Sequence, residues 1–74
     1  MDRAILLRHL AQAERHISEG AGHLARQQEL IDELTRHKHD TRGAQMVLAT
    51  MRETQGLHIE DRNRILAELA NLSD

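Results

Sequence analysis

Apolar residues in the first half of the chain recur at alternating intervals of three and four residues, and the pattern continues through four heptads. One column of this seven-residue frame holds Leu10, Ile17, Leu24 and Ile31, and the neighbouring column holds Leu6, Ala13, Gly20, Gln27 and Leu34. Such spacing is typical of a helix that buries one narrow stripe against another helix. We therefore predict an all-α chain whose first helix covers residues 3–37.

A second frame begins after the segment Arg36–Thr41, with apolar residues at both ends and polar residues between them. Its positions are Ala44, Leu48, Met51, Gln55, His58, Arg62, Ile65, Leu69 and Leu72. The basic residues that precede Asp40 suit the negative end of a helix dipole, and Asp40 or Thr41 can cap the first amide groups of a new helix. We expect a turn at residues 38–40 and a second helix over residues 41–71.

A turn this short makes the two helices antiparallel neighbours. The chain 1–74 is then one helical-hairpin domain, similar to an antiparallel coiled coil. The expected neighbours across its seam are Leu34 with Leu48, Leu24 with Gln55, Ala13 with Ile65, and Leu10 with Leu69. Apolar ends meet apolar ends in this register, so two independent patterns agree on one fold.

Three glycines lie inside the predicted helices, at Gly20, Gly22 and Gly56. Each costs a helix about 1 kcal/mol relative to alanine, so they could divide the chain into shorter helices. The frame passes through them without a change of phase, which favours two continuous helices. In the hairpin register all three reach the same height as Gln55 and the histidines His23 and His58. This polar layer either fixes the register or forms a small polar pocket.

A lone hairpin of this length buries too little apolar surface to offset the entropy of ordering, and no cysteine is present to staple it. Apolar residues beside the seam, among them Ile5, Leu7, Leu30, Leu57, Ile59 and Leu66, would stay in contact with water. We expect a two-fold homodimer that forms a four-helix bundle. Its predicted interface is Leu10, Ala13, Ile17, Leu24, Ile31, Leu34, Leu48, Met51, Ile59, Ile65, Leu66 and Leu69.

The charges and the missing residue types argue against several classes of function. Ten basic and twelve acidic residues are interspersed, and no aromatic side chain can stack on bases, so we expect no nucleic-acid partner. No apolar run approaches a membrane span or the core of a signal peptide, which indicates a cytoplasmic protein without a membrane partner. No nucleophile, phosphate-binding or dinucleotide motif occurs, so we expect neither an enzyme nor a small-molecule substrate.

The chain has six histidines. His9, His16 and His23 are seven residues apart, so they form a row along one edge of the first helix with roughly 10 Å between neighbours. Ligands of one metal ion must converge at about 2 Å from it, and this spacing favours surface residues that flank the seam. Protonation of such a row near pH 6.5 would add like charges beside the seam and loosen an assembly.

The alternative interpretation of the histidines is binding of Zn²⁺, Cu²⁺ or Ni²⁺. Two candidate metal sites follow from it. The first consists of His16, His23 and His58, brought together by tertiary packing or by a dimer, and the second consists of His37, His39 and Asp40 in the turn.

Three segments resemble short bacterial helical-hairpin proteins that have heptad-spaced histidines and no assigned function. They are Ala13–Gly20, His23–Gln27 and His39–Thr41, and the second predicted helix, residues 41–71, matches more loosely. Because those proteins have no known activity, the resemblance implies none for this chain. The histidine row also resembles small histidine-rich metal-binding proteins, which differ in having many more histidines and in being exported.

The function expected from these observations is that of a small self-associating helical protein. It would act as a protein–protein interaction, scaffold or regulatory module, with another protein as its partner and no bound cofactor. The alternative is a histidine-based protein that binds or buffers divalent metal ions.

Overall fold

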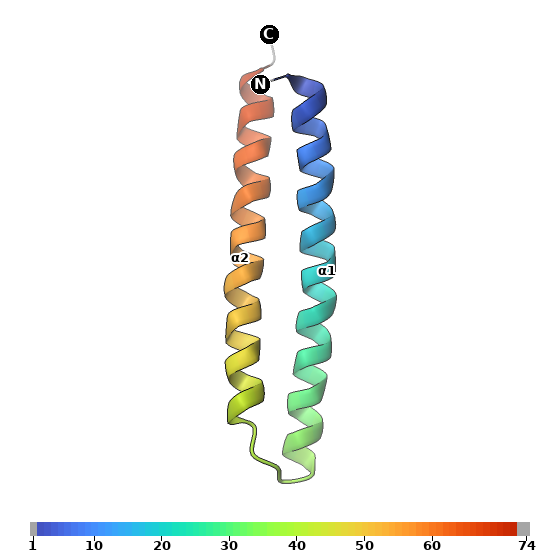
Figure 1. Ribbon diagram of the computed structural model, residues 1–74, viewed down its shortest axis with the longest axis vertical. Coiled ribbons are helices and arrows are strands. Elements are labelled where there is room, and N and C mark those ends of the chain that lie inside the picture. The colour runs from blue at the N-terminus through green and yellow to red at the C-terminus, as the bar shows by residue number, and fades with distance from the viewer. Residues whose placement is uncertain (1, 73–74) are drawn as a thin grey trace.

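The computed structural model describes residues 2–72, which form two antiparallel helices (Figure 1). Helix α1 spans Arg3–Arg36 and helix α2 spans Arg42–Asn71. The two helices pack along their length into a rod whose Cα atoms extend 59 × 14 × 12 Å. The predicted all-helical hairpin is therefore confirmed.

Neither helix is interrupted at its glycines. Helix α1 continues through Gly20 and Gly22, and α2 continues through Gly56. The prediction of two continuous helices is thus confirmed. Each glycine costs its helix about 1 kcal/mol. This cost is small beside the stabilisation that the helices gain by packing against each other, since α1 has 34 residues and α2 has 30.

The core lies along the seam between the helices. Its buried side chains, within the described residues, are Leu6, Ala13, Ile31, Leu48 and Ile65. Leu6, Ala13 and Ile65 form one cluster near the termini, and Leu10 and Leu69 pack against it. The four residues expected to pair at that end, Ala13 with Ile65 and Leu10 with Leu69, thus lie in or against one cluster.

The residues predicted at an oligomer interface occupy two different environments in the single chain. Most of them belong to the seam between α1 and α2. Ala13, Ile31, Leu48 and Ile65 are buried there, and Leu10, Ile17, Leu24, Leu34, Met51 and Leu69 are half-buried. Within this predicted set only Ile59 and Leu66 are exposed.

Helix α1 ends in a Schellman motif. The His39 amide donates to the Leu34 carbonyl at 2.9 Å, and the Lys38 amide donates to the Thr35 carbonyl at 3.1 Å. Lys38 occupies the position that usually holds glycine, with φ 60° in the left-handed region. A side chain at this φ brings Cβ close to the backbone, so Lys38 is strained.

Lys38→Gly is expected to raise the free energy of unfolding by about 1 kcal/mol, because glycine adopts a left-handed φ without this steric cost. Urea unfolding followed by circular dichroism measures the change. Lys38→Ala is the control, since it removes the charge but keeps Cβ, and it should stay within about 0.5 kcal/mol of wild type. Equal gains in the two variants would show that charge, and not backbone strain, matters at this position.

Helix α2 begins after Thr41, whose hydroxyl makes no capping hydrogen bond. Asp40 supplies the acceptor instead, because its Oδ1 receives the Arg42 amide at 3.0 Å. The Arg42 guanidinium also donates to Asp40 Oδ2 at 2.8 Å. These bonds from Arg42 hold the pKa of Asp40 below its usual value. Of the two caps expected, Asp40 is the one that acts through its side chain.

Candidate functional site

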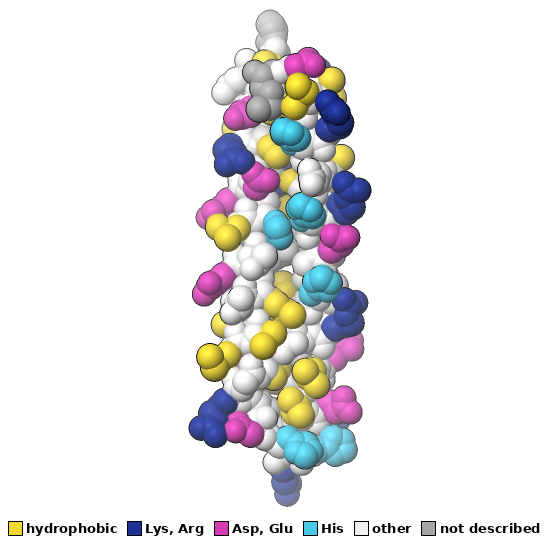
Figure 2. Space-filling model, viewed as in Figure 1, with side chains coloured by type: hydrophobic (Ala, Val, Ile, Leu, Met, Phe, Trp, Pro, Cys, Tyr) yellow, Lys and Arg dark blue, Asp and Glu magenta, His cyan; other side chains and the backbone are white. Residues whose placement is uncertain are grey.

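Three histidines of α1, His9, His16 and His23, lie along one long side of the hairpin. We call it the histidine face and define it by the two heptad columns that flank the seam on this side. They are His9, His16, His23 and Leu30 of α1, and Val47, Thr54, Asp61 and Glu68 of α2. Figure 2 shows histidines gathered along this side, with hydrophobic side chains between them and the loop end.

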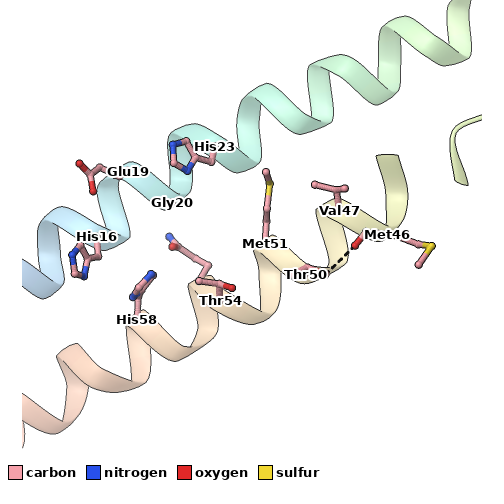
Figure 3. Close-up of a pocket in the computed structure, with 11 residues that line it drawn as sticks. His16, Glu19, Gly20, His23, Met46, Val47, Thr50, Met51, Thr54 and His58 are labelled. Atoms are coloured by element: carbon pink, nitrogen blue, oxygen red, sulfur yellow. Dashed lines mark hydrogen bonds between the residues drawn. The ribbon is translucent and has the colours of Figure 1, made fainter. Parts of the chain in front are cut away.

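The half of the histidine face nearer the loop contains an open groove of about 530 Å³. Val47 and Met51 of α2 form an apolar wall, and His16 and His23 line the opposite side from α1. Figure 3 shows Met51 pointing toward α1. The Thr50 hydroxyl donates to the Met46 carbonyl of its own helix. Because this bond uses the hydroxyl hydrogen, Thr50 offers no free donor to the groove.

Gln55 and Gly20 close the groove at one point of the seam. Gln55 Nε2 donates to the Ile17 carbonyl at 2.8 Å, across the two helices. A Cβ placed on Gly20 would lie 2.0 Å from Gln55 Oε1, so this amide fits only because residue 20 has no side chain. Oε1 is buried and has no hydrogen-bond partner among the described residues.

The expected neighbour of Gln55 is therefore wrong. Gln55 lies against Ile17 and Gly20, about one turn from the expected neighbour Leu24. Because Gly20 has no side chain, the amide of Gln55 can enter the space beside it and reach the Ile17 carbonyl. At Gly56 a Cβ would meet nothing within 4 Å, and at Gly22 it would meet only the end of Arg26, so of the three helical glycines Gly20 is the one that makes room for a neighbour.

His16 and His58 face each other across the groove (Figure 3). Their ring centroids are 5.1 Å apart, with the planes tilted by 47°. Both residues are half-buried, whereas His9 and His23 are exposed. The structure thus brings together two of the three histidines of the first predicted metal site, one from each helix.

Neither predicted metal site is assembled with three ligands. Within residues 2–72 no three His, Cys, Asp or Glu side chains are grouped so that they could hold a metal ion. His23 is one heptad from His16, about two helical turns away. In the loop, the rings of His37 and His39 are 6.4 Å apart, and Asp40 is bound to Arg42. A single chain therefore offers at most a pair of imidazoles.

The half of the histidine face nearer the termini is charged. A second groove of about 490 Å³ is lined there by His9, Asp61, Arg64 and Glu68 above the core residue Ile65. Arg64 and Asp61 form an ion pair one turn apart on α2. The face is accordingly apolar toward the loop and charged toward the termini.

Large apolar side chains are exposed on both long sides of the rod. In the apolar groove, Met46 is 72 % exposed and Val47 47 %. Leu30 of the histidine face is 44 % exposed, and Leu57 of α2 is 65 % exposed. Leu7, Ile59 and Leu66 are also exposed, and their heptad columns lie on the other flank of the seam. The expectation that residues beside the seam stay exposed in one chain holds for Leu7, Leu30, Leu57, Ile59 and Leu66. Ile5 is instead half-buried.

Of the residues in the α2 wall of the groove, sequence reasoning named Met51 as an interface residue but did not predict a groove that it forms with Val47, Thr50 and Thr54. The signal for it was present, since Val47 and Thr54 share one heptad column beside the seam.

Neither α1 nor α2 contains an apolar stretch long enough to span a membrane.

No protein-family model, no curated protein and no solved structure matches this chain. The geometry of the histidine face is thus the basis for assigning a function.

Proposed function

We propose that this protein is a self-associating helical module, in which the histidine faces of two copies meet to form a four-helix bundle. The outer surface of the bundle then serves as a scaffold or regulatory surface for another protein. The observation that carries the proposal is the set of exposed apolar side chains on the histidine face and its groove, Leu30, Met46 and Val47, on a chain with very few buried residues among those described. Full burial of each such side chain contributes about 1.5–3 kcal/mol.

The size of the face suits a second copy of this chain. A side of 59 × 14 Å offers on the order of 800 Å², which is the area that each partner buries in a standard protein–protein interface. A second hairpin has the same length and the same groove, so it can cover the whole face at once. Two-fold symmetry then repeats every favourable contact.

The distribution of residues along the face favours a two-fold axis parallel to the rod, with both loops at the same end. This axis sets α1 of one copy against α2 of the other at equal heights. Within one hairpin those heights are given by His16 beside His58 and by Gly20 beside Gln55. Leu30 then faces the partner's Val47, and His23 faces the partner's Thr54.

The charged half of the face is also complementary in this arrangement. His9 faces the partner's Glu68, and His16 lies level with the partner's His58. An axis perpendicular to the rod would instead set His9 against the partner's Leu30 and Glu68 against the partner's Val47. Because a charged group loses hydration against an apolar side chain without gaining a partner, the parallel arrangement is favoured.

Val47→Lys tests the proposed interface. Two-fold symmetry places two lysines in the apolar half of the dimer, so dimerisation should weaken by more than about 100-fold, or 2.7 kcal/mol. Analytical ultracentrifugation over a range of micromolar concentrations measures the dissociation constant. Ile59→Lys is the matched control on the opposite side and should leave the constant within about threefold of wild type.

Two outcomes would contradict the proposal. A wild-type chain that is folded and monomeric at about 100 μM would exclude self-association as its function. A dimer disrupted by Ile59→Lys but not by Val47→Lys would assign the interface to the opposite side. Circular dichroism of each variant confirms that its helices are intact.

A further inference from the structure

We propose that His16 and His58 from both copies bind one divalent transition-metal ion at the centre of the dimer, through four imidazoles. The inference rests on the proposed self-association and adds to it a ligand and a means of regulation. The metal would join the two hairpins at a single layer, between the apolar and the charged halves of the histidine face.

The spacing of the two rings within one chain fits ligands of one ion. Two imidazoles on a tetrahedral ion, with metal–nitrogen bonds of about 2.0 Å, have ring centroids roughly 5 Å apart. The centroids of His16 and His58 are 5.1 Å apart, and the rings are tilted by 47° rather than stacked flat. Small rotations of the two side chains would aim one nitrogen of each ring at a common point in the groove.

The two rings are also free to act as ligands. No hydrogen bond or ion pair joins either ring to another of the described residues. Both are half-buried, so they are held by the two helices while one side stays open to the groove. Nearby, Gln55 is tied to the Ile17 carbonyl and does not compete for them.

One chain leaves the proposed site half complete. Among residues 2–72 no third His, Cys, Asp or Glu joins the pair in a metal-binding group. Zn²⁺ in structural sites has four protein ligands in a tetrahedron. The two-fold axis parallel to the rod brings the partner's His16 and His58 to the same height, so the dimer supplies the missing pair.

An all-imidazole site selects the class of metal. Imidazole suits Zn²⁺, Cu²⁺, Ni²⁺ and Co²⁺, whereas Mg²⁺ and Ca²⁺ prefer oxygen ligands. A tetrahedral set of four nitrogens favours Zn²⁺ in particular. Because the ion binds only where two copies meet, its binding shifts the monomer–dimer equilibrium toward the dimer by mass action. The assembly state of the protein would thus respond to available zinc.

The test is a Zn²⁺ titration of the full chain by isothermal titration calorimetry, paired with ultracentrifugation in excess zinc and in EDTA. The expected result is one zinc per two chains and a dimer at least about tenfold tighter in zinc than in EDTA. Co²⁺ in place of zinc should give the visible spectrum of a tetrahedral site.

Four single variants locate the ligands. His16→Gln and His58→Gln should each abolish both the binding heat and the tightening by zinc. His9→Gln, in the same column of α1, and His37→Gln, in the loop, should behave as wild type. Circular dichroism in EDTA checks that all four variants keep their helices.

The outcomes separate the metal inference from the proposed dimer. A dimer in EDTA that zinc does not tighten overturns the metal site and leaves the proposed function standing. Zinc bound at one per chain without association, or binding lost in His37→Gln and kept in His16→Gln, overturns the inference as well. A monomer in both EDTA and zinc overturns the inference and the proposed function together.

Discussion

Ile65→Ala is expected to lower the free energy of unfolding by about 2–5 kcal/mol, the largest effect that we predict for a single substitution. Ile65 is only 4 % exposed and packs in the cluster with Leu6 and Ala13. Truncating it removes buried methyl groups and leaves a cavity that Ala13, already small, cannot fill. Urea unfolding followed by circular dichroism, at one fixed chain concentration, measures the loss.

Ile59→Ala is the matched control for this prediction, because it makes the same change on the same helix. Ile59 is 36 % exposed and lies on the side away from the histidine face. Its truncation should cost less than about 1 kcal/mol. Equal losses in the two variants would mean that Ile59 is covered in the assembled protein, which would place the dimer interface on the opposite side.

Gly20→Ala is expected to differ from the same change at the other helical glycines by about 1–2 kcal/mol. Gly56→Ala and Gly22→Ala should each raise the free energy of unfolding by up to about 1 kcal/mol, since alanine favours the helix and neither Cβ meets a close neighbour. At Gly20 the new Cβ would lie 2.0 Å from Gln55 Oε1. The Gln55 side chain must move and give up its hydrogen bond to Ile17, which cancels or reverses the gain.

A double-mutant cycle with Gln55→Ala identifies the cause of this difference. Once the Gln55 side chain is removed, Gly20→Ala should stabilise the protein as much as Gly56→Ala does. The coupling energy between positions 20 and 55 should then be about 1–2 kcal/mol, within the range for residues in contact. A coupling energy near zero would show that Gln55 adjusts to a side chain at residue 20 without loss.

Much of the fold follows from patterns within each half of the chain. The heptad columns that contain Leu10, Ile17, Leu24 and Ile31 continue through Gly20 and Gly22, and the structure has an unbroken helix there. The change of composition at Arg36–Thr41 marked the turn, and Asp40 does accept an amide of the new helix. Pairing of the apolar ends was also predictable, since Ala13 and Ile65 share one cluster.

The candidate site was predictable only in part. Its residue types stood out, because six histidines and a buried-column glutamine are unusual in so short a chain. Their partners did not. His58 meets His16 and not His23, and Gln55 meets Ile17 and Gly20 and not Leu24. A heptad pattern has an apolar residue about once per turn of each helix. If one helix shifts by one turn along the other, most apolar residues therefore still face apolar residues.

The repeat of apolar residues was enough to dictate two continuous helices and their antiparallel packing, because periodicity and turn chemistry act over a few neighbouring residues. The axial offset between the helices, and hence the groove and the His16–His58 pair, was decided only in three dimensions. That offset depends on how individual side chains fit across the seam, and the seat of the Gln55 amide beside Gly20 is a contact between residues 35 positions apart. No local pattern encodes such a contact, since it arises only when both helices are already packed.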